Sequence, residues 1–173
     1  MRMVSWIPAL ALLLAACGAA GGATESDATS WRDASLTDVR TGETFRISEL
    51  GGKLVVVEPM AIWCVNCQFQ QSAVATALER GAQPGLVYLS LDVDPNERPE
   101  DLARYADEAG FGWRFVVASR EVARSLAADL GDQVLSPPST PSIVLGPDGS
   151  LLEKHLGIRG ADDLVGLFEQ YAP

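Results

Sequence analysis

Two cysteines separated by two residues are the side chains of this sequence best suited to chemistry. Cys64 and Cys67 lie in the stretch Trp63-Cys64-Val65-Asn66-Cys67, a few residues after the apolar run 54–57. A pair at this spacing, at the junction of a predicted strand and a predicted helix, indicates a thiol–disulfide redox site. Cys64 would lie at the helix N-terminus, where free backbone N–H groups and the helix dipole favour a thiolate, and Cys67 about one turn later, within reach of a disulfide. One cysteine can then attack a partner's disulfide, and the other can resolve the mixed disulfide.

The same pair could instead be half of a zinc site or a purely structural disulfide. A zinc site usually needs a second pair of cysteine or histidine ligands. The sequence has only one further cysteine, Cys17, and one histidine, His155. Cys17 has a different explanation, given below, and we interpret His155 as a surface residue of a predicted strand. We therefore predict a redox-active disulfide and no metal site.

The pair needs a strand and a helix to hold it, and the sequence predicts both. Residues 54–57 are apolar and mostly β-branched, which is typical of a strand buried on both faces. Apolar residues at i, i+4 spacing predict a helix from about Val65 to Arg80. The further predicted elements are strands at 44–47, 86–91 and 113–118, helices at 99–109 and 119–130 (the second with Ser119 as its N-cap), a hairpin of strands 142–145 and 151–156, and a last helix that begins near Asp162. This alternation predicts an α/β fold in three layers, with a mixed central sheet and helices on both faces.

The start of the chain predicts targeting. Residues 1–16 combine Arg2 with an apolar run, which is the pattern of a signal peptide. The run is shorter than the about 20 residues that a membrane-spanning helix needs. The stretch Leu14-Ala15-Ala16-Cys17 resembles a bacterial lipobox, which implies cleavage before Cys17 and attachment of a lipid to it. The alternative is an ordinary secretory signal, with Cys17 incidental.

The chain after the signal peptide divides into two parts. Residues 17–30 are small and polar, and they predict a flexible tether that follows the lipidated Cys17. Residues 31–173 are predicted to form one folded domain, anchored to a membrane through the lipid. The predicted location is the bacterial cell envelope, on the extracytoplasmic side of a membrane, where disulfides persist.

The charge of the chain argues against one class of partner. The sequence has 23 acidic and 13 basic side chains, a formal net charge of -10. Binding to nucleic acid needs clustered lysine and arginine, so we predict no nucleic-acid partner. A length of 173 residues and 47% hydrophobic side chains fit one domain with extensions. We expect a monomer.

The sequence resembles the thioredoxin fold and, within it, the extracytoplasmic TlpA/ResA-like thiol–disulfide oxidoreductases in their lipoprotein form. The resemblance rests on the order of the elements, on Trp-Cys-x-x-Cys after the central strand and on Thr140-Pro141 before the hairpin, and it covers about residues 36–172. The extra strand–helix unit at 86–110 separates this branch from plain thioredoxin. The resemblance implies a thioredoxin-like fold with a strand–helix insertion, and an enzyme that exchanges protein disulfides.

The resemblance also implies roles for single residues. Cys64 would be the exposed nucleophile and Cys67 the more buried resolving thiol, joined as a disulfide in the oxidised protein. Trp63 would lie beside the nucleophile and shape the surface on which partners dock. The peptide bond between Thr140 and Pro141 would be cis, and it would present the Thr140 backbone to a substrate strand.

Glu58 is a further candidate for the site. It lies six residues before Cys64, where many thioredoxins carry a buried acid. A buried carboxyl would have a raised pKa and could move protons to or from Cys67. The alternative is a carboxylate that reaches solvent at the end of a strand. Pro59, which follows it, departs from the usual aromatic or apolar residue.

The direction of electron flow stays open. Reducing members of the fold usually carry proline where this chain has Asn66, and the residues between the cysteines influence the redox potential. The family includes reductases that keep the haem-binding thiols of apocytochromes reduced and proteins that serve copper-site assembly in cytochrome oxidase. The implied partners are cysteine-containing extracytoplasmic proteins and a membrane thiol–disulfide electron carrier, with no cofactor beyond the redox-active disulfide.

Two other functions compete with disulfide exchange. A copper-binding chaperone of the Sco type shares the fold, and the thiolates of Cys64 and Cys67 would suit Cu(I). Its cysteines are spaced by three residues and joined by a distant histidine, and this chain lacks both features unless His155 serves. A peroxidase of the peroxiredoxin type would need a threonine three positions before the nucleophile, where this chain has Ala61.

Overall fold

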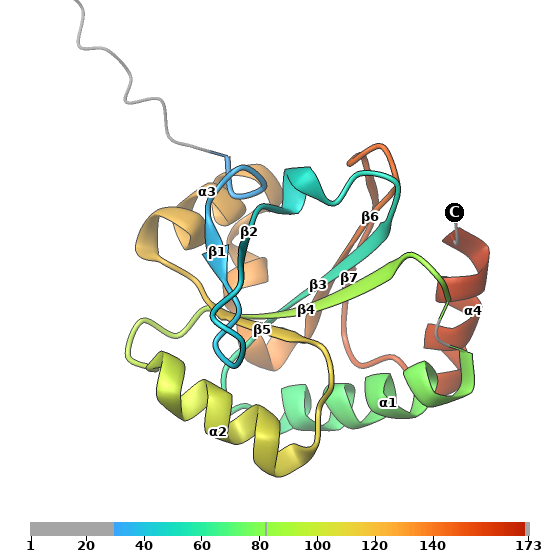
Figure 1. Ribbon diagram of the computed structural model, residues 1–173, viewed down its shortest axis with the longest axis horizontal. Coiled ribbons are helices and arrows are strands. Elements are labelled where there is room, and N and C mark those ends of the chain that lie inside the picture. Colours follow the sequence, from blue (N-terminus) through green and yellow to red (C-terminus); the bar gives the residue numbers. More distant parts are fainter. Residues whose placement is uncertain (1–29, 82, 172–173) are drawn as a thin grey trace, which may run out of the picture.

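The computed structural model describes residues 30–81 and 83–171 (Figure 1). The predicted signal peptide, Cys17 and nearly all of the predicted tether lie outside the described residues. Among the helices that are described, none is long and apolar enough to cross a membrane.

A five-stranded mixed sheet forms the centre of the fold, in the order β5-β4-β3-β6-β7. The central strand β3 (Leu54–Met60) is parallel to β4 and antiparallel to β6, and all seven of its residues are buried. The other strands are β4 (Leu86–Asp92), β5 (Arg114–Val117), β6 (Pro141–Leu145) and β7 (Leu151–Leu156). Burial on both sides explains why β3 reads as a continuous apolar run instead of an alternating one.

Helices cover both faces of the sheet, as predicted. On one face α1 (Val65–Gly81), α2 (Pro99–Ala109) and α4 (Ala161–Tyr171) pack on a core that includes Val56 and Phe115. On the other face α3 (Arg120–Leu130) packs with the N-terminal segment on a second core. Figure 1 shows α3 beside β1 (Leu36–Thr37) and β2 (Thr44–Phe45), and α1 and α2 on the opposite side of the sheet.

Local signals explain several of the element boundaries. Ser119 caps α3 as predicted, because its hydroxyl accepts a hydrogen bond from the Val122 N–H at 3.2 Å. Gly110 ends α2 with φ +71°, a left-handed conformation that glycine adopts without steric cost. The predicted strand at 44–47 is shorter than expected: β2 (Thr44–Phe45) pairs with β1 (Leu36–Thr37), and a 3₁₀ helix begins at Ile47.

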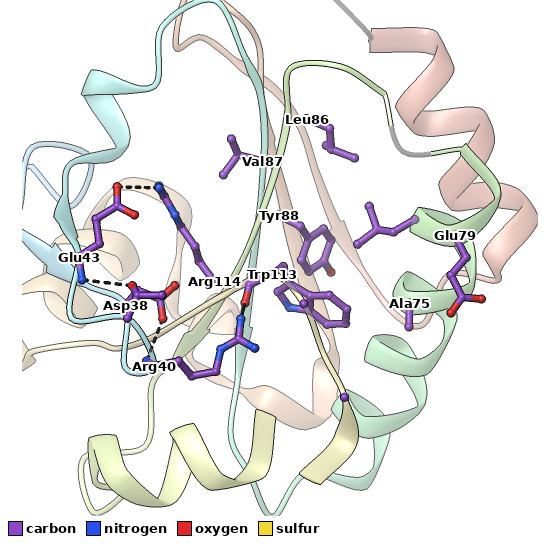
Figure 2. A pocket seen from close by; sticks show the side chains of 14 residues that line it. Asp38, Arg40, Glu43, Ala75, Glu79, Leu86, Val87, Tyr88, Trp113 and Arg114 are labelled. Atoms are coloured by element: carbon purple, nitrogen blue, oxygen red, sulfur yellow. Dashed lines mark hydrogen bonds and ion pairs between the residues drawn. The ribbon is translucent and has the colours of Figure 1, made fainter. Parts of the chain in front are cut away.

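A cavity of about 710 Å³ lies between α1 and the turn that follows β1 (Figure 2). Arg40 and Arg114 lie on the side of this turn, and Tyr88 and Trp113 also line the cavity. The cysteine pair is not among the lining residues. This cavity is therefore separate from the disulfide, although Tyr88 and Trp113 also take part in the polar network described below.

Candidate functional site

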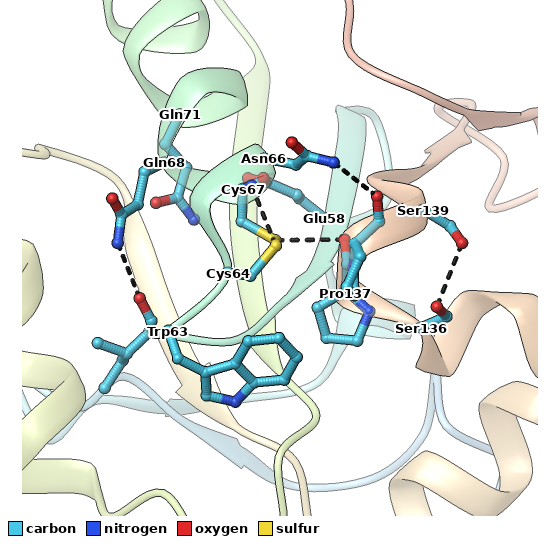
Figure 3. Close-up of a disulfide and its surroundings, with 12 residues drawn as sticks. Glu58, Trp63, Cys64, Asn66, Cys67, Gln68, Gln71, Ser136, Pro137 and Ser139 are labelled. Atoms are coloured by element: carbon cyan, nitrogen blue, oxygen red, sulfur yellow. Dashed lines mark hydrogen bonds between the residues drawn. A yellow bond between two sulfur atoms is a disulfide. The ribbon is translucent and has the colours of Figure 1, made fainter.

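Cys64 and Cys67 form a disulfide at the N-terminus of α1 (Figure 3). The carbonyl of Cys64 accepts the helical hydrogen bond from the Gln68 N–H, and Cys64 Sγ accepts one from the Cys67 N–H at 3.1 Å. Cys64 therefore occupies the N-cap position, and its sulfur takes the place that a serine or aspartate oxygen usually takes. In the reduced protein the same N–H group and the helix dipole favour the thiolate of Cys64.

Both cysteines are buried, so the expected exposure of Cys64 is wrong for this oxidised form. The exposed fraction is 2% for Cys64 and none for Cys67. The 3₁₀ helix η3 (Pro137–Ser139) packs against the start of α1, and Cys67 Sγ lies 3.4 Å from the Pro137 carbonyl oxygen. Asn66 Nδ2 donates to the Pro138 carbonyl at 2.9 Å and ties the two segments together. Cys64 is therefore almost completely covered in this oxidised form.

Trp63, the residue before Cys64, is exposed, as predicted. More than half of its surface, 54%, is accessible, and Val65 and Phe69 on α1 are also exposed. The Trp63 indole N–H donates to Asp94 Oδ2 at 2.6 Å. This hydrogen bond, followed by that from the Asn96 backbone, holds the pKa of Asp94 below its usual range.

The turn before the disulfide is also held at Ile62. The Ile62 N–H lies 3.0 Å from each carboxylate oxygen of Glu97, and the Ile62 carbonyl accepts from Gln68 Nε2 at 3.0 Å. Burial, followed by a hydrogen bond with Glu97, raises the pKa of the neighbouring Asp92 to about 9. The loop between β4 and α2 therefore holds this turn with carboxylates that the sequence analysis did not single out.

Glu58 is fully buried, so the predicted buried acid is confirmed and the solvent-exposed alternative is wrong. It extends from β3 toward the face covered by α1, and Figure 3 shows it pointing toward the start of this helix. Burial raises its pKa to about 8, although the hydrogen bonds from Tyr88 and Ser90 and the polar side chain of Gln71 oppose the rise. At neutral pH this carboxyl therefore holds a proton most of the time, and it can release that proton near pH 8.

A buried polar network surrounds Glu58. Its Oε2 accepts from the Tyr88 hydroxyl at 3.2 Å and from the Ser90 hydroxyl at 3.3 Å, and Ser90 Oγ accepts from Trp113 Nε1 at 2.9 Å. The parallel register places Ser90 directly beside Glu58. Sequence reasoning missed these residues, although Tyr88 and Ser90 gave a signal: they are polar side chains at alternate positions of a strand that is otherwise apolar.

The predicted cis peptide bond at Pro141 is wrong, because the described residues contain no cis peptide bond. The trans form is favoured for most bonds that precede proline. The chain enters β6 through Thr140, which is buried and has φ +46°, an unusual conformation for a β-branched residue. Thr140 and Pro141 still lie where the hairpin begins, directly after η3 and so close to the disulfide.

Pro59 does not disturb β3, which continues to Met60. The register that pairs Val57 with Ile143 would place Pro59 opposite Pro141. Neither proline has an N–H group to donate, and the antiparallel ladder between β3 and β6 ends at Val57. The two prolines therefore end the ladder at the edge of the sheet that lies next to the cysteines.

Comparison with solved structures identifies the architecture. A thiol:disulfide interchange protein of the thioredoxin family from Chlorobium tepidum matches with a TM-score of 0.67 at 20% identity, over 81% of this chain and 93% of that one. The chain has a thioredoxin-like fold. A secreted Mycobacterium tuberculosis disulfide oxidoreductase homologous to E. coli DsbE matches with a TM-score of 0.64 at 14% identity, over 81% of this chain and 97% of that one. No protein-family model and no curated protein matches the sequence.

A Sco-family protein also shares the thioredoxin-like fold. A Sco-family cytochrome c oxidase assembly protein matches with a TM-score of 0.63 at 16% identity, over 80% of this chain and 91% of that one. Within residues 30–81 and 83–171 no group of three or more cysteine, histidine or acidic side chains is placed to hold a metal ion. His155 lies in β7, paired with Ser142. Cys64 and Cys67 are thus the ligands that this site could offer to Cu(I).

Proposed function

We propose that this protein is a thiol–disulfide oxidoreductase that exchanges disulfides with cysteine-containing proteins outside the cytoplasm. The observation that carries the proposal is the disulfide between Cys64 and Cys67 at a helix N-terminus, on the same side of the sheet as the buried Glu58, whose pKa is raised to about 8 by burial. A purely structural disulfide would have no use for such an acid, because burying Glu58 costs stability.

The exchange runs in two balanced steps. In the reduced protein the Cys64 thiolate attacks a partner's disulfide, forms a mixed disulfide and releases one partner thiolate. Cys67 then loses its proton to ionised Glu58 and attacks Cys64 Sγ, which re-forms the internal disulfide and releases the second partner thiolate. Two electrons pass from the pair to the partner. In the reverse direction neutral Glu58 returns the proton to Cys67.

The cellular setting of the proposal comes from the sequence. The lipobox at Cys17 supports a lipid anchor in the bacterial cell envelope, with the redox domain on the extracytoplasmic side of the membrane. A membrane thiol–disulfide electron carrier would recycle the pair. Apocytochrome thiols and the copper site of cytochrome oxidase are the substrate classes that we propose, because the resembled family serves both.

The test is the redox potential of the Cys64–Cys67 pair, measured by equilibrating the protein in dithiothreitol or glutathione buffers. A potential near about -270 mV would make the protein a reductant of its partners' disulfides, and one near about -120 mV an oxidant. In either case Cys67→Ser should accumulate a mixed disulfide with its partner, whereas Cys64→Ser should form none. Failure to form an internal disulfide would contradict the proposal.

The second candidate is Cu(I) binding by the same cysteines, favoured by the structural similarity to a Sco-family protein. Competition with a Cu(I) chelator separates the two functions. Tight Cu(I) binding together with slow or absent disulfide exchange would support the chaperone. Rapid exchange with weak Cu(I) binding would support the oxidoreductase.

A further inference from the structure

Gln71 is a buried polar side chain to which the exchange steps above give no role. It lies on α1, one turn beyond Cys67, and it is inaccessible to solvent. An amide group buried without hydrogen-bond partners costs about 1–3 kcal/mol. We therefore expect both ends of the Gln71 amide to have hydrogen-bond partners.

The two ends of the Gln71 amide face different partners. Its Oε1 accepts a hydrogen bond from the hydroxyl of Tyr105, which comes from α2. Its Nε2 has no hydrogen-bond partner, and neither has Glu58 Oε1. The Gln71 side chain nonetheless lowers the pKa of Glu58, and Figure 3 shows both side chains beside Cys67 at the start of α1. The two unpaired atoms therefore belong to side chains that interact with each other.

The hydrogen-bond partners that Glu58 requires differ between its two protonation states. Its Oε2 is occupied in both by the donors Tyr88 and Ser90. When the carboxyl is ionised, Oε1 needs a donor; when it is neutral, Oε1 carries the proton and needs an acceptor. An amide has a donor at one corner and an acceptor at the other, and a tyrosine hydroxyl can both donate and accept.

We propose that Gln71 is a positioning residue that serves both protonation states of Glu58 by reversing its amide. With ionised Glu58, Nε2 donates to Glu58 Oε1 and the Tyr105 hydroxyl donates to Oε1 of the amide. With neutral Glu58, the amide is rotated by half a turn, so that the Glu58 O–H donates to the amide oxygen and the amide nitrogen donates to the Tyr105 hydroxyl. Proton transfer between Glu58 and Cys67 then leaves neither Glu58 Oε1 nor the Gln71 amide unpaired, an inference that deepens the proposed function and rests on it.

The other polar groups around Glu58 do not provide this exchange. Tyr88 and Ser90 come from β4 and occupy the other carboxylate oxygen, and Cys67 comes from α1. Trp113, which directly precedes β5, donates to Ser90 and not to Glu58. Burial raises the pKa of Tyr88 and of Tyr105, so both hydroxyls stay neutral while Glu58 titrates. No cation is among the groups that shift the pKa of Glu58 in the described part of the chain.

The amide reversal has a spectroscopic signature. In the oxidised full chain, labelled with ¹³C at the glutamate carboxyls and ¹⁵N at the glutamine amides, a pH titration follows Glu58 and Gln71 in one sample. Glu58→Gln and Gln71→Met identify the two signals. We expect the Gln71 amide resonances to move with the midpoint of the Glu58 carboxyl. Amide resonances that do not respond at this midpoint would overturn the proposal, and this readout needs no variant that might fold poorly.

Two variants test how much the Gln71 amide contributes to the pKa of Glu58. Gln71→Met keeps the shape of the side chain but removes its donor and acceptor. Ionised Glu58 then loses a charge-assisted hydrogen bond, which is stronger than the bond that neutral Glu58 loses. The Glu58 midpoint should therefore rise by about one pH unit. Gln70→Met is the matched control, because Gln70 is also buried on α1 but accepts from the Arg159 N–H at 2.7 Å. The midpoint should not move in this control. An unchanged midpoint in Gln71→Met, or an equal rise in both variants, would refute the role of Gln71.

These readouts are independent of enzymatic activity. If the protein exchanges no disulfides but the Gln71 amide follows Glu58, the proposed function fails while the hydrogen-bond exchange stands. If exchange is rapid while the amide stays fixed, the proposed function survives and the role of Gln71 fails.

Discussion

Trp63 donates its indole N–H to Asp94 Oδ2, while the other carboxylate oxygen of Asp94 accepts from the Asn96 N–H at 2.8 Å. One side chain thus orders the loop after β4 with one oxygen and holds the tryptophan beside the nucleophile with the other. This relationship connects the exposed residue that precedes the disulfide to a loop that lies 31 residues away in the sequence.

Asp94→Asn should separate these two tasks. Asparagine oxygen can still accept from Asn96, but its NH₂ group cannot accept from the indole. Loss of this charge-assisted bond, about 1 kcal/mol, should slow exchange with a disulfide-bonded protein about fivefold, with little change toward dithiothreitol. Stopped-flow tryptophan fluorescence measures both rates. The same substitution in a Trp63→Phe background should have no effect, and an equal loss in both backgrounds would show that Asp94 acts only on its own loop.

Glu58→Gln should flatten the dependence of stability on pH. The pKa of Glu58 is raised from 4.5 to about 8 in the folded protein, so its contribution is fully present below pH 4.5 and is lost as the pH rises through 8. The total is on the order of 4–5 kcal/mol. We expect denaturant unfolding of the oxidised protein between pH 4 and 9 to show that the free energy of unfolding of Glu58→Gln rises relative to that of the wild type as the pH increases. Above pH 8 the variant should be the more stable protein. A constant difference between the two proteins would contradict a buried, titrating Glu58.

The same substitution should slow one catalytic step selectively. Without Glu58 as proton acceptor, deprotonation of Cys67 should slow by about a hundredfold near pH 8, while the first attack by Cys64 should change little. Acid quenching followed by alkylation, sampled over time, reports the mixed disulfide and the re-formed pair separately. A longer-lived mixed disulfide is the expected result. Equal slowing of both steps would indicate damage to the site as a whole.

Ser119→Ala tests a prediction made from sequence and confirmed in the structure. Removal of the N-cap bond to Val122 should lower the free energy of unfolding by about 1 kcal/mol. Ser72→Ala is the control, because Ser72 lies on the exposed side of α1 and bonds back to the Gln68 carbonyl, and such a bond adds little to helix stability. Equal losses in the two variants would contradict the capping role.

The sequence by itself determined the redox pair, the positions of most elements and the layering of the fold. These predictions rest on local patterns, which can be recognised without knowing the partner strands: the apolar run at 54–57, the spacing of Cys64 and Cys67, and the capping by Ser119. Short or polar elements were less predictable. Residues 36–37 became a strand because they pair with β2, and residues 47–49 became a 3₁₀ helix with Ile47 in the second core; tertiary contacts, not intrinsic preference, fix such short segments.

Only the tertiary structure decided the environment of the chemistry. The burial of both cysteines, the trans bond at Pro141 and the contact of Trp63 with Asp94 depend on segments that are far apart in the sequence. The same holds for Glu58, whose pKa and hydrogen-bond partners come from β4, α1 and the burial that they create. Desolvation and hydrogen-bond geometry act through space, so the sequence could name the acid, but the packed sheet and helix determined when it holds its proton.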